Sequence, residues 1–209
     1  MAYRPTEATR ASAQAKRDAV LAAARDVVAA GGFAGASVAA IAERSGVSVG
    51  SVYSYFDNRE ALLAEVFRAA AEEEFARVAR VVGDAGGDPA ARLAALIDTF
   101  AERALRGRRM AWSLLFEPVT AAVDAERLRL RRSYRELGET IVADGIAAGT
   151  FVDQDVPVVA GAVMGAVSES LVGALNPELT PHPPADPAAL IATIRRFCFL
   201  ALGARPTEN

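Results

Sequence analysis

The chain is poor in the residues that build covalent and metal-based sites. Among its 209 residues there is one cysteine, Cys198, and one histidine, His182. A single cysteine excludes a disulfide within the chain and fits a reducing compartment, and no metal cluster can be assembled from these two residues. We therefore expect no metal and no cofactor, and we expect Cys198 to be a small buried hydrophobe rather than a redox sensor.

Long apolar runs and alternating patterns are also missing. No segment approaches the roughly 18 uninterrupted apolar residues of a membrane span, and residues 1–9 lack the apolar core of a secretory signal. We therefore expect a cytoplasmic protein without a membrane partner. Aromatic residues make up only 7% and no alternating run is long enough for a sheet, whereas apolar residues reach 52% and alanine is abundant. This composition predicts an all-α fold.

Apolar residues recur at helical spacing along almost the whole chain and predict about nine helices. The pairs Asp88-Pro89 and Asp186-Pro187 are typical helix starts, and Asn176-Pro177 is a typical stop. The expected helices span about 11–30, 38–45, 49–56, 58–82, 89–105, a short stretch between Gly107 and Pro118, 121–148, 156–175 and 187–202.

The segment Ser37–Glu60 predicts two short helices joined by a tight turn. Ser37 and Ser48 can cap these helices with their hydroxyl oxygens, and Gly46 can adopt the left-handed conformation that a sharp turn needs. Asp57 is expected to cap a third, longer helix. This arrangement is a helix-turn-helix, which places its second helix in the major groove of DNA.

The second of these helices is expected to have two different sides. Val49, Val52 and Phe56 lie at i, i+3 and i+7 and are expected to face inward. On the other side, small residues leave room for base edges, and tyrosine hydroxyls and an arginine can contact phosphates. The expected DNA-binding residues are Ser37, Ser48, Gly50, Ser51, Tyr53, Ser54, Tyr55 and Arg59.

The amino-terminal residues carry an excess of positive charge. Residues 1–17 contain four basic residues and one acid, Glu7, which gives a local net charge of +3 in a chain whose total is −3. A positive arm ahead of a helix-turn-helix can lie along DNA phosphates or a groove. An ordinary solvated tail would have the same composition, and the sequence leaves both interpretations open.

Residues from about Ala13 to Phe67 resemble the DNA-binding domain of the TetR family of transcriptional regulators. Arg59 stands where this family usually has a phosphate-contacting lysine, and Ser37 stands where threonine is commoner. The resemblance implies a helix-turn-helix DNA-binding domain over residues 1–57 and a ligand-binding and dimerisation domain over residues 58–209. The segments that carry it are Gly31-Gly32-Phe33, Ser37-Val38-Ala39-Ala40-Ile41-Ala42, Gly46-Val47-Ser48, Val52-Tyr53-Ser54-Tyr55-Phe56 and Arg59-Glu60-Ala61-Leu62.

The resemblance also implies a function. We expect a repressor that binds a palindromic operator as a homodimer and leaves it when a small-molecule effector binds. We do not expect an enzyme, because the chain has no Glu-x-x-His pair, no histidine-rich cluster and no glycine-rich phosphate loop. An interaction module without DNA binding is the other alternative, and the tyrosines and Arg59 argue against it.

The last two expected helices, 156–175 and 187–202, are apolar over more than one side. A helix buried all round in a soluble chain needs a second partner, and the same two helices of another copy could supply it about a two-fold axis. Both helices could instead be central in a monomer. The resemblance favours a homodimer through these helices, because the TetR family dimerises through its final two long helices.

The middle helices carry aromatic and sulfur-containing side chains that can line an apolar pocket between helices. The same side chains could equally fill the core. Glu169 is distinctive because it lies in an otherwise apolar helix, where an unpaired carboxylate is costly; it could pair with an arginine across a dimer or recognise a polar group of a ligand. The residues expected around the effector are Phe100, Met110, Trp112, Phe116, Tyr134, Met164 and Glu169.

Overall fold

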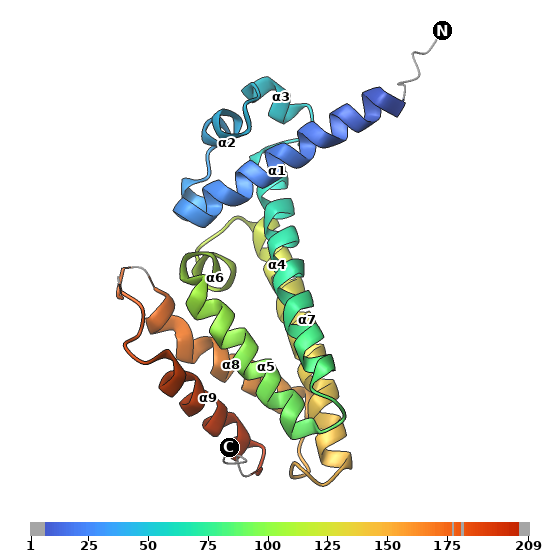
Figure 1. Ribbon diagram of the computed structural model, residues 1–209, viewed down its shortest axis with the longest axis vertical. Helices are drawn as coiled ribbons and strands as arrows, with labels where there is room; N and C mark the ends of the chain where they lie inside the picture. The colour runs from blue at the N-terminus through green and yellow to red at the C-terminus, as the bar shows by residue number, and fades with distance from the viewer. Residues whose placement is uncertain (1–6, 177, 181, 205–209) are drawn as a thin grey trace. The chain divides into compact units, whose positions relative to one another are not determined.

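The computed structural model describes residues 7–176, 178–180 and 182–204, and this part of the chain contains helices and no strand (Figure 1). The expected all-α fold is confirmed. For the helices after α3, the ends differ from the expected ones by no more than two residues. The helices found in the described residues are α1 (Glu7–Gly35), α2 (Val38–Ser45), α3 (Val49–Tyr53), α4 (Arg59–Asp84), α5 (Pro89–Arg106), α6 (Arg108–Leu115), α7 (Ala121–Ala147), α8 (Val156–Leu175) and α9 (Pro187–Ala201).

Aspartates and prolines set the starts of three of these helices. Asp88, Asp155 and Asp186 accept hydrogen bonds from backbone N–H groups in the first turns of α5, α8 and α9, and each of these turns contains a proline. Proline is well tolerated there because the N–H that it lacks has no partner within the helix. The two Asp-Pro pairs therefore identified the starts of α5 and α9 correctly.

The amino-terminal helix is longer than expected. α1 begins at Glu7, so residues 7–17 of the expected basic arm are helical, while Arg4 lies outside the described residues. The charge of Arg17 is used internally, since its Nη2 donates to Glu65 Oε1 at 2.6 Å.

The other end of α1 is interrupted where a stop was expected. Gly32 has φ 75° and ψ 179°, which breaks the helix, and the residues up to Gly35 form a separate turn. A left-handed φ of this kind is accessible to glycine without steric cost.

Two expectations for the next helices are wrong. α3 ends at Tyr53 rather than at Phe56, although Phe56 is still buried, through the turn that follows the helix. α4 is capped by Asn58 rather than by Asp57, because Asn58 Oδ1 accepts a hydrogen bond from the N–H of Ala61 at 2.8 Å.

Contacts divide the chain into two units. The first unit comprises the residues up to Ala70 together with Glu117–Glu126, and the second comprises Ala71–Phe116 and the residues from Arg127 onward. The resemblance implies functional domains that meet between residues 57 and 58; by contacts, the first unit extends to Ala70 and includes a segment from the middle of the chain.

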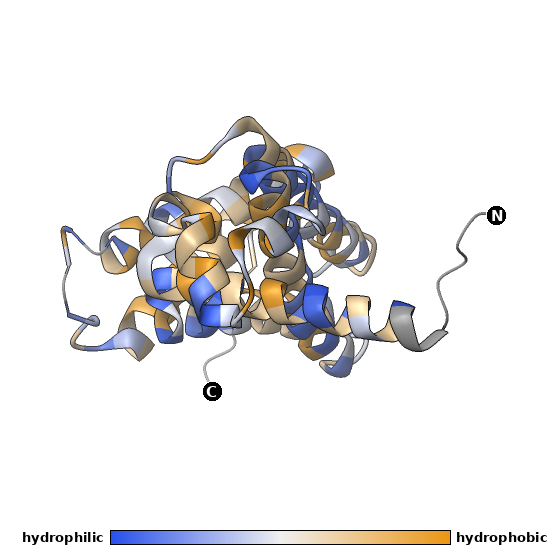
Figure 2. Ribbon diagram, turned by 90° about the horizontal axis from the view of Figure 1, so that it is seen from above, coloured by the Kyte–Doolittle hydropathy of each residue, from blue (hydrophilic) through white to orange (hydrophobic). Residues whose placement is uncertain are grey.

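Each unit has an apolar core, and along the helices the ribbon alternates between hydrophilic and hydrophobic residues, as amphipathic helices do (Figure 2). In the second unit α5 packs against α6, α8 and α9, and α8 also packs against α6 and α9. The first core includes Val20, Ala24, Val28, Phe33, Ile41, Val52, Phe56, Leu62, Leu63 and Phe67, and the second includes Leu93, Leu96, Ile97, Ile141, Val167, Leu171, Leu175, Ile194 and Leu202.

The single cysteine is part of the second core. Cys198 is fully buried, and this burial raises the pKa of its thiol to about 11. A neutral, inaccessible thiol is a poor nucleophile, so Cys198 is the small buried hydrophobe that the sequence predicts.

The last two helices expose much of their apolar surface. The side chains of Val158, Phe197 and Leu200 are 65%, 60% and 58% exposed. Only 28% of the apolar stretch of α8, whose mean hydropathy is 1.7, is buried. By length and composition alone α8 could cross a membrane, a property that core helices of soluble proteins share. The broad apolar surface expected on these helices is therefore present.

Candidate nucleic-acid interface

The helix-turn-helix forms as expected from its caps and turn. The Oγ atoms of Ser37 and Ser48 each accept a backbone N–H, at 3.1 Å, in the first turns of α2 and α3. Gly46 has φ 70° and ψ 22°, and its N–H donates to the carbonyl of Glu43 at 3.2 Å. These local hydrogen bonds satisfy helix-end groups and set the angle at which α3 leaves α2.

The second helix of the motif has a buried and an exposed side. Val52 is 1% exposed and faces the core of the first unit, whereas Tyr53 is 48% exposed. Gly50 is also exposed, and Ser51 and Tyr55 are half-buried. Small residues and tyrosine hydroxyls therefore share an accessible surface on and directly after α3, as the sequence predicts.

The serine hydroxyls of this region are engaged within the motif. Ser48 Oγ and Ser51 Oγ lie 2.9 Å apart in a hydrogen bond, and Ser54 Oγ donates to the carbonyl of Gly50 at 3.1 Å. Because a hydroxyl oxygen has two lone pairs, Ser51 and Ser54 can still accept from another molecule. Their internal bonds hold them in fixed positions.

Arg59 is held inside the first unit. Its Nε donates to the carbonyl of Ala36 and its Nη2 donates to the carbonyl of Phe33, both at 2.8 Å. The sequence predicts that Arg59 contacts a phosphate, but the structure shows two donors of its guanidinium bonded to the backbone that follows the break in α1. Arg59 therefore positions the helix-turn-helix, and its expected phosphate contact stays a prediction.

Glu117 also stabilises the backbone after the break in α1, and no sequence pattern indicated this role. Its Oε1 accepts the N–H of Ala34 at 2.9 Å, and its side chain is buried. The only local signal was an acid directly before Pro118, which does not indicate a partner 83 positions away in the chain. The segment Glu117–Glu126 is further tied to α4 by an ion pair of 3.0 Å between Glu126 and Arg68.

The second unit contains two neighbouring cavities of about 80 and 290 Å³. Phe100 and Tyr134 line both, with their ring centres 5.2 Å apart in an edge-to-face arrangement. Of the other residues expected around an effector, Met110 lines the smaller cavity, and Phe116, Met164 and Glu169 line the larger. Trp112 lines neither; its ring packs against Phe116 with ring centres 5.4 Å apart.

The two cavities differ in their polar groups. The wall of the smaller one carries an ion pair, in which Arg103 Nε donates to Glu74 Oε2 at 2.6 Å. Burial, with a smaller contribution from Glu74, raises the pKa of Tyr134, so its hydroxyl is neutral at physiological pH.

The larger cavity is lined by three arginines of α7, Arg127, Arg131 and Arg135, and by one acid, Glu169. Arg127 is buried and donates to the carbonyls at the end of α6, whereas Arg131 and Arg135 are exposed. Glu169 is exposed as well, so in this chain its carboxylate does not carry the cost of burial expected for an unpaired acid in an apolar helix. Among the described residues, no three His, Cys, Asp or Glu side chains gather as metal ligands would.

A helix-turn-helix with an accessible second helix, followed by a helical unit with internal cavities, is the architecture of a ligand-binding DNA-binding protein. Two family models match the chain: residues 20–66 match "Bacterial regulatory proteins, tetR family" and residues 86–171 match "Tetracyclin repressor-like, C-terminal domain". The chain belongs to the TetR family. By family it is a transcriptional regulator.

Individual relatives agree with this assignment. The HTH-type transcriptional regulator BetI of Stenotrophomonas maltophilia (strain R551-3) is 38% identical over 86 residues, covering 41% of this chain and 44% of that protein. The HTH-type transcriptional repressor KstR2 of Rhodococcus jostii (strain RHA1) is 29% identical over 124 residues, covering 57% of this chain and 60% of that protein. The matched part thus spans about half the length of these relatives.

A solved structure shows the same fold. The transcriptional regulator FadR from Bacillus subtilis, determined in complex with stearoyl-CoA, superposes with a TM-score of 0.72 and 19% sequence identity, covering 87% of this chain and 96% of that chain.

The placement of Arg59 leads to a stability prediction. Arg59→Ala should lower the free energy of unfolding by roughly 3 kcal/mol, because it removes two charge-assisted hydrogen bonds to partly buried carbonyls. Arg59→Lys should lie between this variant and the unsubstituted protein, since an ammonium cannot bond both carbonyls in the same fork geometry. Urea unfolding followed by circular dichroism measures both changes.

The matched control is Arg44→Ala, which removes an exposed ion pair of 2.7 Å with Asp26 in the same unit. An exposed pair of this kind contributes about 0–1 kcal/mol. Equal, small losses for Arg44→Ala and Arg59→Ala would contradict the positioning role.

Proposed function

We propose that this chain is a transcriptional repressor that binds a palindromic operator as a homodimer and is released from DNA by a small molecule. The observation that carries the proposal is the exposed side of α3, with Gly50, Ser51 and Tyr53 accessible while Val52 is anchored in the core. The name of the relative KstR2 supports the choice of repressor over activator. A regulator of this kind works in the cytoplasm, where its DNA lies.

The DNA contacts follow from the two sides of α3. Gly50 and Ser51 allow the helix to approach base edges closely, and Tyr53 and Tyr55 donate hydroxyl hydrogen bonds to phosphates. Ser37, Ser48 and Ser54 contribute through the helix ends and the hydrogen bonds that they keep in place. Arg59 positions the motif through its two bonds to the backbone.

The DNA-binding proposal is tested by selecting bound sequences from a random pool with the full chain. The enriched site should contain two inverted half-sites about one helical turn apart. Tyr53→Phe removes one hydroxyl from each protomer and should weaken binding to every enriched sequence about fivefold per half-site, which is about 25-fold for the dimer, because each lost hydrogen bond contributes about 1 kcal/mol. Fluorescence anisotropy measures the affinities.

The control for this experiment is Thr140→Ala, which removes an exposed hydroxyl from α7 in the second unit. It should leave the affinity for DNA unchanged. No enrichment of any sequence by the unsubstituted protein, or equal affinities of Tyr53→Phe and the unsubstituted protein, would contradict the proposed placement of α3 in the groove.

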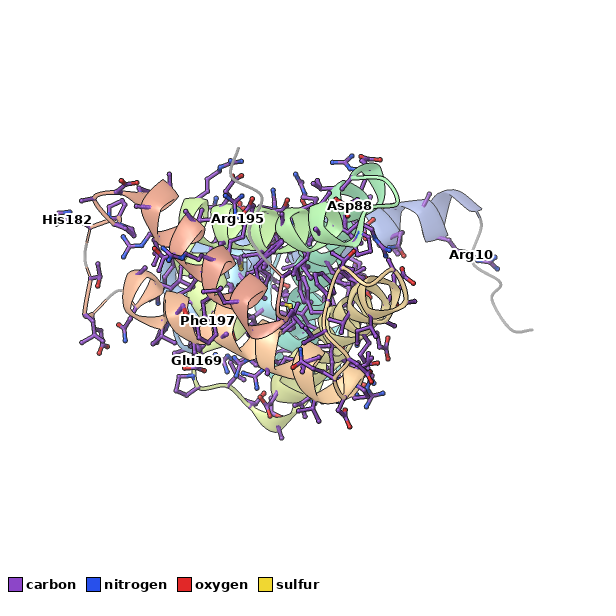
Figure 3. The ribbon with its side chains drawn as sticks, turned by 90° about the horizontal axis from the view of Figure 1, so that it is seen from below. Arg10, Asp88, Glu169, His182, Arg195 and Phe197 are labelled. Carbon is purple, nitrogen blue, oxygen red and sulfur yellow. The ribbon has the colours of Figure 1, made fainter. Side chains whose placement is uncertain are left out.

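The homodimer is supported by the outward side of the last two helices. Figure 3 labels Phe197 of α9 and Glu169 of α8. The side chain of Phe197 is 60% exposed. An apolar groove of about 290 Å³ is lined by Phe197 and by residues of both helices, among them Val159, Ala162 and Ala166. A second copy related by a two-fold axis would cover this surface with an identical one.

A charge placed in this surface should separate the protomers. Phe197→Asp should shift the protein from dimer to monomer and lower its operator affinity, because one protomer reaches only one half-site. Leu128→Asp is the matched control, since Leu128 of α7 is 58% exposed. It should leave the dimer intact. Analytical ultracentrifugation measures the mass.

Two outcomes would overturn the dimer proposal. One is a monomeric unsubstituted protein at every attainable concentration. The other is a protein that stays in solution only with detergent or lipid vesicles, which would identify α8 as a membrane segment instead.

The effector that suits the second unit is a small apolar molecule with one anionic group. Most of the lining of the cavity of about 290 Å³ is apolar, and the arginines outnumber the single acid, Glu169. FadR from Bacillus subtilis was determined with stearoyl-CoA, which combines an apolar chain with anionic groups. Ligand pockets in proteins run from about 300 to 1,000 Å³, so the larger cavity fits a compound at the lower end of that range.

Filling the larger cavity should make the protein insensitive to its effector. Gly161 lines this cavity, and a Cβ built on it would meet nothing within 4 Å. Gly161→Leu should therefore fold and occupy cavity space, raising the effector concentration that releases half of the DNA at least tenfold, whereas Gly161→Ala should change it little. Release is followed by anisotropy in a screen of apolar carboxylates and acyl thioesters. Equal release curves for the two variants would contradict this position of the effector.

A further inference from the structure

The first residue of α3 is an apolar side chain that faces outward. Val49 is 43% exposed, although the spacing of Val49, Val52 and Phe56 predicts that all three face inward. Val49 is the first residue of α3, directly after its cap Ser48. Side chains on a helix tilt toward its amino-terminal end, so the Val49 methyl groups project beyond the first turn rather than onto the core.

The remaining side chains of α3 offer few ways to recognise a base. Its sequence is Val-Gly-Ser-Val-Tyr, which contains no amide, carboxylate or guanidinium group. Direct purine recognition by two hydrogen bonds requires such groups. The hydroxyl of Ser51 is already bonded to Ser48, and Val52 is buried. At the amino-terminal turn, where recognition helices contact bases, Val49 is the largest accessible side chain.

The major groove contains one apolar group that such a side chain can recognise, the 5-methyl group of thymine. We propose that Val49 packs against a thymine methyl group in each half-site and so selects an A·T pair at that position. The inference rests on the proposed DNA-binding function and adds a specificity-determining residue to it. Gly50, next to Val49, has no side chain that would keep the helix away from the base.

The contact can be tested on the DNA without changing its hydrogen-bonding groups. Deoxyuridine differs from thymidine in the major groove only by the missing methyl group. Each thymine of the selected operator is replaced by deoxyuridine in both half-sites together. Burial of one methyl-sized group corresponds to about a fourfold change in affinity per half-site and to about fifteenfold for both. One symmetric position should show this loss with the unsubstituted protein.

Variants of Val49 identify the side chain that makes the contact. With Val49→Ala, the affinity for the thymine-containing operator should fall by a similar factor, and the deoxyuridine substitution should have no further effect. Val49→Thr keeps one methyl group and should retain a reduced sensitivity. Tyr53→Phe, which changes a hydroxyl on the same helix, should bind more weakly but keep the full deoxyuridine effect.

The outcomes separate the inference from the function on which it rests. A deoxyuridine effect that persists in Val49→Ala, or an operator without a methyl-sensitive position, overturns the inference while leaving DNA binding intact. A pool that yields no enriched sequence with the unsubstituted protein overturns the proposed function, and the inference with it. Loss of the deoxyuridine effect in Val49→Ala alone supports the inference.

Discussion

The DNA-binding region depends on the hydrogen bonds that backbone N–H and C=O groups make where α1 breaks. At Gly32 the left-handed φ of 75° ends the regular hydrogen-bond ladder, and the peptide groups that follow need new partners. Arg59 donates to two of their carbonyls and Glu117 accepts one of their amides. Because α2 starts at Val38, directly after this break, its direction depends on these two charged side chains.

Local hydrogen bonds also hold α3 in place. A helix of five residues is too short to be stable by itself. It is held in place by a capping serine, by the buried side chain of Val52 and by the turn at Gly46. The serine hydroxyls serve this local structure first. The accessible side chains of α3 are uncharged and partly apolar, which favours recognition by close fit over recognition by charged side chains.

Sequence patterns predicted those features that are decided within a few residues. The Asp-Pro pairs before α5 and α9 and the serine caps of α2 and α3 are local hydrogen-bonding signals, and the structure agrees with them. Spacing alone failed for Val49, because periodicity does not show whether the core reaches as far as the first turn of the helix, where Val49 is 43% exposed. Charge alone could not show the backbone partners of Arg59 and Glu117, which come from distant parts of the chain. Composition grouped the aromatic residues but could not show that Trp112 lines neither cavity.

The short stretch after α6 limits how freely that helix can shift. Leu115 lines both cavities, and Glu117 accepts a hydrogen bond from the amide of Ala34. Only one residue, Phe116, lies between Leu115 and Glu117 in the chain. A single residue spans at most about 3.6 Å, so this tether has almost no slack. A ligand that pushes the end of α6 by more than a few ångströms must therefore either pull Glu117 off the amide or drag the attached backbone along with it.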